Sequence, residues 1–298
     1  MLWVINGLIY GFFTAVYLLF NQHFKINGYI LGIWRGFGIC AIFLPFVFCF
    51  PFPTDIKYWL LLVAQGYCIG VYDSHIFFAS AKFGAGPTSR FMAVTVLLTT
   101  VIWWFLTPDK FMHLLQDSDR LVTLILVLCG FCFCYWQMLQ SEVSREAAIY
   151  MLPAVLALSA MCVMTKYIAM GTRTLWQALS YYLTVSTFVS GCYNLFWYTI
   201  SEQNKKTKPD KIFSKHMLKI GTLLVLFSTL LIVAKTMALR LAVNPGYVAA
   251  LLLVVPLFTL ALNKHYKVAD KVSVEAGLAM IFFLSLLILL VYDGVVVD

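Results

Sequence analysis

Long apolar segments dominate this sequence and are separated by short polar stretches. Ten of these segments come close to or exceed the roughly 20 residues that a helix needs to cross the hydrocarbon core of a bilayer. They cover residues 2–22, 29–50, 57–81, 87–107, 120–138, 147–168, 174–200, 218–239, 245–262 and 272–292. A transmembrane barrel would instead show strands of about ten residues with alternating polarity. The sequence therefore predicts an all-α integral membrane protein with ten transmembrane helices.

The composition leaves little room for a soluble domain. Hydrophobic residues make up 62% of the 298-residue chain and charged residues only 11%, whereas soluble domains have about 25% charged residues. The longest polar stretch, residues 201–217, is too short for a catalytic domain. Residues 1–20 have neither a basic amino-terminal region nor a signal-cleavage site. We therefore expect the first segment to be retained as a transmembrane helix.

Enzyme signatures are also missing from the sequence. It contains no H-E-x-x-H, G-x-S-x-G, G-x-G-x-x-G or P-loop pattern. The dipeptides Tyr72-Asp73 and Tyr292-Asp293 resemble the paired aspartates of intramembrane proteases. However, the second dipeptide lies at the end of the last segment and lacks a G-x-G-D context. We therefore expect a protein that is not an enzyme and that needs no cofactor.

Three of the eight cysteines, Cys129, Cys132 and Cys134, are closely spaced within one apolar segment. They fit either a metal site or small packing residues of a helix. A structural zinc site takes four ligands, and neither a second ligand pair nor a histidine accompanies these three. We therefore favour packing and expect no bound metal.

The formal net charge of +8 reflects an uneven distribution of basic residues among the loops. Twelve of the 21 basic residues fall on one set of alternate loops or beside it, and six fall on the other. The positive-inside rule places the twelve in the cytoplasm, which leaves both termini outside. Half of the twelve come from residues 201–219, a solvated loop or a contact for anionic lipid. Topology explains the basic excess, and we expect no nucleic-acid partner.

Two turns in the two halves of the chain follow the same pattern. In each, a span ends, a basic residue follows, and a short turn containing Gly or Asn leads into Pro at the start of the next span. Aligning Pro87 with Pro245 also matches Lys82 with Arg240. The alternative interpretation is that unrelated tight turns between helices also use Pro and Gly.

Five predicted spans separate the two turns, so the two halves of the chain would have opposite orientations in the bilayer. The domain prediction is therefore two inverted five-helix repeats, residues 1–140 and 145–298, within a single membrane domain. Inverted repeats of this kind are common in transporters, which bind their substrate near the midplane between the repeats. We expect a central cavity at that position.

The clearest likeness to a known family lies in the second half, where residues 235–257 read KTMALRLAVNPGYVAALLLVVPL. Residues 79–89 read ASAKFGAGPTS at the matching place in the first half, and Arg35 lies in the second span. These features resemble the drug/metabolite transporter superfamily and its ten-span EamA-like branch. The resemblance implies inverted five-helix repeats, a central cavity and alternating access. It also implies substrates such as amino acids, nucleotide sugars and drugs, and termini in the cytoplasm, opposite to the charge distribution. The first-half counterpart of Pro256 is Leu98, a departure from the family pattern.

Four ionisable residues within the predicted spans are candidates for a substrate site. A charge at the centre of a span costs at least about 2.5–3.5 kcal/mol, so such residues are functional candidates. Arg35, Asp73, His75 and Arg90 all fall within about 12 Å of the same membrane face. Arg35 and Arg90 would bind a carboxylate or phosphate, Asp73 an amine or a proton, and His75 a proton near neutral pH. The alternative is that the arginines extend to lipid headgroups and Asp73 pairs with one of them.

Further candidates come from a lysine and from aromatic residues. Lys235 lies about six residues from the opposite membrane face, by the matching turn of the second half, where it would bind or gate from that side or extend to the headgroups. Trp34, Tyr72 and Tyr181 are next to charged residues or inside a span, where they can form the walls of a cavity for an amphipathic solute. All four are predicted to bind substrate.

The sequence thus predicts a secondary transporter that moves a small polar or amphipathic metabolite by alternating access, with protons as a candidate coupling ion. The alternatives are a flippase for lipids or lipid-linked metabolites and a structural membrane protein without transport. The protein would act as a monomer or homodimer. A compact chain without an N-x-S/T sequon favours a bacterial inner membrane. The sequence leaves the substrate and the direction of transport open.

Overall fold

The computed structural model describes residues 2–109, 112, 118–139, 144–201, 212–268, 275, 278–279, 282–283 and 285–286. Within these ranges the chain is helical apart from short connections. The α-helices are α1 (Leu2–Phe24), α2 (Gly28–Val47), α3 (Ile56–Phe83), α4 (Ala85–Arg90), α5 (Val94–Leu106), α7 (Ser118–Leu139), α8 (Arg145–Met170), α9 (Leu175–Tyr181), α10 (Thr187–Ile200), α12 (Lys215–Leu241), α13 (Pro245–Leu251) and α14 (Val255–His265).

Three short segments join some of these helices into longer rods. The 3₁₀ segments η1 (Phe91–Ala93) and η3 (Leu252–Val254) connect α4 to α5 and α13 to α14. The π-helical segment η2 (Tyr182–Ser186) connects α9 to α10. The described part of the chain therefore forms nine continuous helical rods.

Nine of the ten predicted apolar segments coincide with these rods, and the tenth, residues 272–292, lies mostly outside the described residues. Among the described ranges, six rods are long and apolar enough to cross a membrane: Leu2–Phe24, Gly28–Val47, Ala85–Leu106, Arg145–Met170, Lys215–Leu241 and Pro245–His265. The chain is therefore a helical integral membrane protein with several transmembrane segments.

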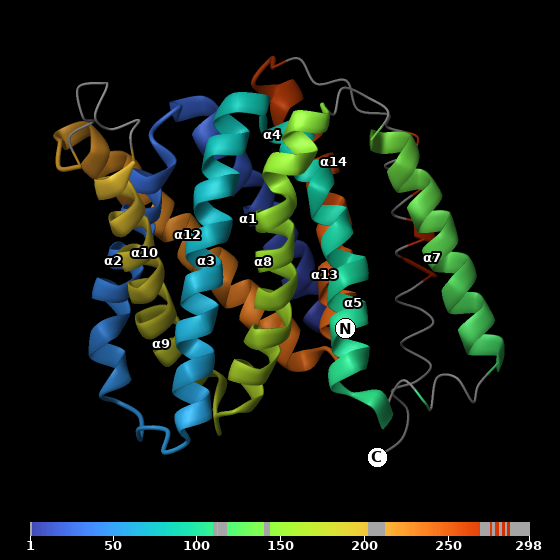
Figure 1. The fold of residues 1–298 in the computed structure, drawn as a ribbon, viewed down its shortest axis with the longest axis horizontal. Helices are drawn as coiled ribbons and strands as arrows, with labels where there is room; N and C mark the ends of the chain where they lie inside the picture. The colour runs from blue at the N-terminus through green and yellow to red at the C-terminus, as the bar shows by residue number, and fades with distance from the viewer. Residues whose placement is uncertain are drawn as a thin grey trace.

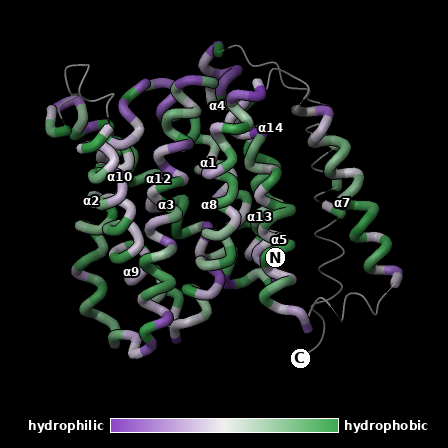
Figure 2. The backbone as a smooth tube through the Cα atoms, in the orientation of Figure 1, coloured by the Kyte–Doolittle hydropathy of each residue, from purple (hydrophilic) through white to green (hydrophobic). Residues whose placement is uncertain are grey.

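The surface polarity of the rods fits this assignment. Apolar residues cover the middle of the helices, whereas polar residues gather at the helix ends and in the connections (Figure 2). Large apolar side chains such as Leu60, Phe105 and Leu126 are exposed on the outer faces. Lipid solvates such a surface, and water does not. The helix α7 lies at one edge of the bundle, beyond α5 (Figure 1).

Glycines bring α10 close to both α2 and α3. Gly36 on α2 faces Gly191 on α10, where an added Cβ would lie only 2.5 Å from the backbone nitrogen of Gly191. On α3, a Cβ added to Gly66 would likewise lie 2.5 Å from the carbonyl oxygen of Ser186. Each glycine belongs to a G-x-x-x-G pattern, Gly32–Gly36 and Gly66–Gly70, which lets helix backbones approach closely in membranes. This packing places α10 against the polar residues of α2 and α3.

The two interrupted rods, α4–η1–α5 and α13–η3–α14, pack against each other in opposite directions. The helix α4 contacts α14, α5 contacts α13, and the two 3₁₀ segments contact each other. Elsewhere the most extensive packing joins α3 to α8, α1 to α12 and α2 to α10. In Figure 1 these helices form the body of the bundle.

Polar contacts at the two ends of the bundle fix the helix termini. At one end, the Lys82 Nζ donates to Glu146 Oε1 at 2.6 Å and links the end of α3 to the start of α8. At the other end, the buried Lys166 donates to the carbonyl oxygens of Arg240 and Ala242. A cation at the carboxyl end of α12 also interacts favourably with the helix dipole.

Candidate functional site

An ion pair between α2 and α3 lies inside the bundle. The Arg35 Nη1 donates to Asp73 Oδ2, and the two residues are only 3% and 0% exposed. Asp73 is ten residues from the end of α3, about 15 Å along the helix axis, so the pair is deep below that end. The sequence left open a shared substrate cavity or a pair between Asp73 and an arginine, and the structure shows the pair between Asp73 and Arg35 with both side chains buried.

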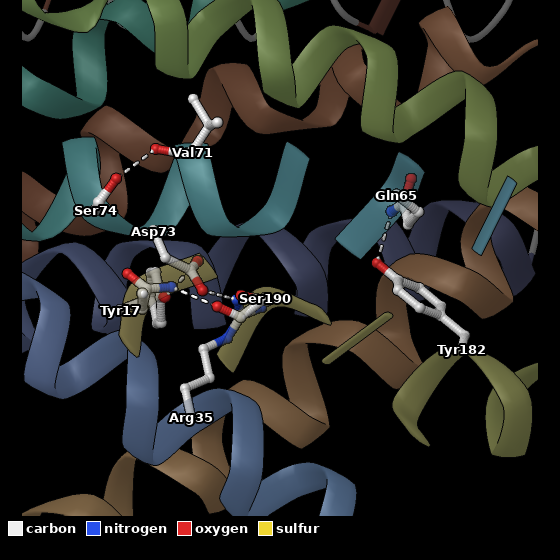
Figure 3. Close-up of polar contacts among 9 residues, drawn as sticks. Tyr17, Arg35, Gln65, Val71, Asp73, Ser74, Tyr182 and Ser190 are labelled. Carbon is white, nitrogen blue, oxygen red and sulfur yellow. Dashed lines mark hydrogen bonds and ion pairs between the residues drawn. The ribbon is translucent and has the colours of Figure 1, made fainter. Parts of the chain in front are cut away.

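Two further side chains surround the ion pair. The Tyr17 hydroxyl of α1 donates to Asp73 Oδ1 at 2.7 Å, and the Arg35 guanidinium lies over the Tyr17 ring at 5.3 Å from its centroid. Ser190 of α10 lies beside the same carboxylate (Figure 3). Four helices therefore contribute to this group, which we call the Asp73 cluster: Tyr17, Arg35, Asp73 and Ser190.

The carboxylate of Asp73 has the hydrogen-bond donors and the opposite charge that a buried carboxylate requires. Each carboxylate oxygen of Asp73 accepts at least one hydrogen bond, and the opposite charge of Arg35 is in contact. Burial of an ion pair costs several kcal/mol per ion, which the mutual attraction repays only when the remaining polar atoms are satisfied. Among the described residues, Arg35 Nε has no hydrogen-bond partner, so this compensation is incomplete. Because the contacts join different helices, any movement of α2 relative to α3 changes them.

A second polar group lies further along α3. Gln65 Nε2 donates to the Tyr182 hydroxyl of η2 (Figure 3) and to Thr165 Oγ1 of α8, both at 2.9 Å. Gln65 is fully buried, and its Oε1 atom has no hydrogen-bond donor within the described part of the chain. The acceptor Tyr182 begins the π-helical segment, a distortion that occurs frequently at functional sites.

Lys235 contributes a third polar element, from α12. Its side chain is only 1% exposed, and among the described residues its Nζ has neither a hydrogen-bond acceptor nor a carboxylate within 4.0 Å. The ammonium lies within electrostatic reach of the thiols of Cys68 on α3 and Cys162 on α8. The sequence placed Lys235 near a membrane surface, where it would reach headgroups, but its side chain is enclosed by protein.

Basic residues predominate among the buried ionisable side chains that the structure describes. Those with a formal charge are Arg35, Asp73, Arg90, Lys166 and Lys235. Arg35 pairs with Asp73, and Lys166 donates to carbonyl oxygens at one end of the bundle. Buried charges are normally paired in proteins. Lys235 Nζ departs from this rule within the described ranges.

The structure places the other two ionisable candidates on α4 and α3. Arg90 is fully buried in α4. His75 is on α3, with Nδ1 at 2.8 Å from the carbonyl oxygen of Val71, and its ring packs against Tyr150 of α8 at 5.3 Å. His75 follows Asp73 by two residues, about 200° around the helix, so it faces α8 and not the ion pair.

The aromatic candidates have different surroundings. Tyr72 is buried, and its hydroxyl is 4.0 Å from the sulfur of Met92. Trp34 donates from Nε1 to the carbonyl oxygen of Ile212 at 2.9 Å and so packs at the start of α12. Tyr181 donates to the carbonyl oxygen of Pro51 at 3.1 Å and holds the connection between α2 and α3. These contacts give Trp34 and Tyr181 positions outside the Asp73 cluster.

The sequence prediction missed several residues that the structure brings to the interior. Tyr10, Thr14, Tyr17 and Asn21 are all buried on one face of α1. Their spacing of three or four residues is that of a helix face, which gives an otherwise apolar span a polar stripe. The stripe was readable from the sequence, and it points to the side of α1 that faces Asp73.

The cysteines of α7 form no recognisable metal site. Cys129 and Cys132 are exposed, whereas Cys134 is buried. In the ranges that the structure describes, no three His, Cys, Asp or Glu side chains are grouped to hold a metal ion. Comparison of the sequence with protein-family models and with curated proteins gives no match. The assignment of function therefore depends on the buried polar groups and on the arrangement of the helices.

Proposed function

We propose that the protein is a secondary transporter that carries a small polar or amphipathic metabolite with an ionised group across the membrane by alternating access. The observation that carries the proposal is the Arg35–Asp73 ion pair, buried among four helices of a membrane protein. Ionisable residues at such depth are costly, and in membrane proteins they commonly mark substrate or ion pathways.

The pattern of helix contacts supports two inverted repeats. In the proposed repeats, the corresponding helices are α1 and α8, α2 and α9–α10, α3 and α12, and α4–α5 and α13–α14. When both helices of a contact are replaced by their counterparts, the result is another contact of the same bundle. The α3–α8 contact becomes the α12–α1 contact, α3–α10 becomes α12–α2, α1–α3 becomes α8–α12, and α5–α8 becomes the contact of α1 with α13–α14. All of these contacts occur. Two inverted repeats of five helices each produce such pairs of equivalent helix contacts.

The interrupted rods add to this support. Both rods that begin at the matched turns carry a 3₁₀ segment within their first ten residues, and these two segments contact each other. Transporter sites near the membrane midplane commonly involve interrupted helices from the two repeats. These features support the resemblance to the ten-span drug/metabolite transporters; the tenth span that the sequence predicts, residues 272–292, lies mostly outside the described residues.

The Asp73 cluster gives the transport cycle a chemical basis. A cationic group or a proton that binds Asp73 competes with Arg35, and an anionic group that binds Arg35 competes with Asp73. Either event breaks the contact between α2 and α3. Substrate binding is thereby coupled to a rearrangement of the helices that enclose the site.

Solute counterflow in proteoliposomes tests the proposal. Purified protein is reconstituted, loaded with one unlabelled solute from a panel of amino acids, organic acids and nucleotides, and assayed for uptake of the same labelled solute. We expect uptake of at least one solute by the wild-type protein and by Glu146→Gln, which changes an exposed ion pair. Asp73→Asn should reduce that uptake at least about ten-fold, as expected for loss of one charged contact. Lipid scrambling without solute counterflow would instead assign a flippase, and equal uptake by Asp73→Asn would contradict the proposed site.

A further inference from the structure

We propose that Lys235 provides the counter-charge for a carboxylate group of the transported solute. The inference rests on the proposed transport function and specifies the class of solute. It starts from the Lys235 Nζ, which is enclosed by protein and lacks an acceptor within the described ranges. An ammonium group carries three donors, and burying it without acceptors is costly. A bound anion supplies both the charge and the acceptors.

Within the described part of the chain, no carboxylate lies within 4.0 Å of the Lys235 ammonium. The thiols of Cys68 and Cys162 are among the groups within its electrostatic reach. Gln65 precedes Cys68 by three residues and Thr165 follows Cys162 by three, so each pair shares a helix face about one turn apart. The hydrogen-bonded group of Gln65, Thr165 and Tyr182 therefore lies about one helical turn from these two thiols.

Lys235 itself offers the donors that a carboxylate needs. Its ammonium has three N–H donors, and within the described part of the chain none of them has an acceptor. The two oxygens of a carboxylate accept several hydrogen bonds, so one carboxylate can take up these donors.

The chemistry of lysine favours a carboxylate over a phosphate at this position. Phosphate recognition commonly uses the bidentate fork of arginine, whereas lysine acts as a single point charge. Of the two buried arginines of the described residues, Arg35 is engaged in its ion pair with Asp73, and Arg90 belongs to α4. A monoanionic carboxylate requires one compensating charge, and Lys235 provides it.

Thermal unfolding of the purified protein in detergent tests this inference without knowledge of the natural solute. The probes are acetate and propionate, with acetamide and propionamide as uncharged controls at the same ionic strength. A ligand that binds only the folded protein raises its apparent stability. We expect the carboxylates to raise the unfolding midpoint of the wild-type protein and the amides to leave it unchanged.

The matched variants are Lys235→Met and Lys219→Met, which remove a buried and an exposed lysine from the same helix. We expect Lys235→Met to weaken carboxylate binding about 30-fold or more, as for truncation of one partner in a buried charged contact. Lys219→Met should respond like the wild-type protein. An undiminished carboxylate response in Lys235→Met would overturn the inference.

A second measurement applies to the wild-type protein alone and covers the case in which Lys235→Met does not fold. Carboxylate bound at Lys235 should slow alkylation of the partly exposed Cys68 by N-ethylmaleimide, measured by mass spectrometry. The exposed Cys192 should react at the same rate with and without carboxylate. No protection of Cys68 would also overturn the inference.

The outcomes separate this inference from the proposed function. Carboxylate binding that depends on Lys235, without counterflow of any solute, would support the site and contradict the transporter. Counterflow that is limited to uncharged or cationic solutes and unaffected by Lys235→Met would support the transporter and contradict the carboxylate site.

Discussion

Removing the carboxylate of Asp73 should destabilise the folded protein far more than removing an exposed carboxylate. In Asp73→Asn the Arg35 guanidinium loses its counter-charge while it stays buried at 3% exposure. Breaking a buried pair by removing one partner costs about 3–5 kcal/mol, because the remaining charge is left without compensation. The hydrogen bond from Tyr17 is also weakened, since its acceptor becomes neutral. We therefore expect Asp73→Asn to lower the free energy of unfolding by about 3–5 kcal/mol.

The exposed ion pair of the same chain provides the matched control. The side chains of Lys82 and Glu146 are 59% and 68% exposed, although their 2.6 Å separation is that of a good hydrogen bond. Exposed pairs contribute about 0–1 kcal/mol. Glu146→Gln should therefore change the free energy of unfolding by less than about 1 kcal/mol.

The assay is equilibrium unfolding in detergent micelles by titration with sodium dodecyl sulfate, followed by tryptophan fluorescence. The double variant Arg35→Met/Asp73→Leu completes the test, because it removes both charges together. Replacing a buried pair with apolar residues of similar size is often neutral or stabilising. The double variant should therefore recover most of the stability that Asp73→Asn loses, although it should not transport. If Asp73→Asn and Glu146→Gln lowered the free energy of unfolding equally, Arg35 and Asp73 could not be a buried pair whose charges compensate each other.

Two further predictions concern helix packing. Gly36→Ala should destabilise the protein by about 1–3 kcal/mol in the same unfolding assay, because its Cβ would collide with the backbone of Gly191. The control is Gly11→Ala, whose Cβ meets only ordinary contacts, and this variant should be neutral or stabilising. Lys166→Met should cost about 1.5–3 kcal/mol, because the end of α12 loses charged hydrogen bonds to two carbonyl groups, and exposed Lys215→Met serves as its control. If Gly36→Ala or Lys166→Met lost less unfolding free energy than its control, the contact assigned to that residue would be contradicted.

The apolar pattern predicted the helices well, because span length depends mainly on hydrocarbon thickness. Nine predicted segments coincide with helical rods, and the matched turns at Pro87 and Pro245 both precede interrupted rods. Side-chain directions were harder to predict. A helix buried on several sides has no polar face that reveals its rotation.

Rotation about the helix axis explains the different surroundings of neighbouring candidates. Trp34 is one residue from Arg35, about 100° away, and it packs against the start of α12. His75 is two residues from Asp73 and contacts α8. Proximity in sequence therefore did not imply a shared site. The polar stripe on α1, which contains Tyr17, was a better guide to the interior, because its members repeat at helical spacing.

Accessibility of the Asp73 cluster from the two sides of the membrane tests the central claim most directly. Ser190→Cys, in a background without the native cysteines, places one thiol beside the ion pair. We predict that a membrane-impermeant, negatively charged methanethiosulfonate modifies this thiol from either side of oriented vesicles. Saturating transported solute should change the ratio of the two rates, as alternating access requires. A thiol that stays unreactive from both sides, with and without solute, would mean that the bundle has a closed interior and would contradict transport through it.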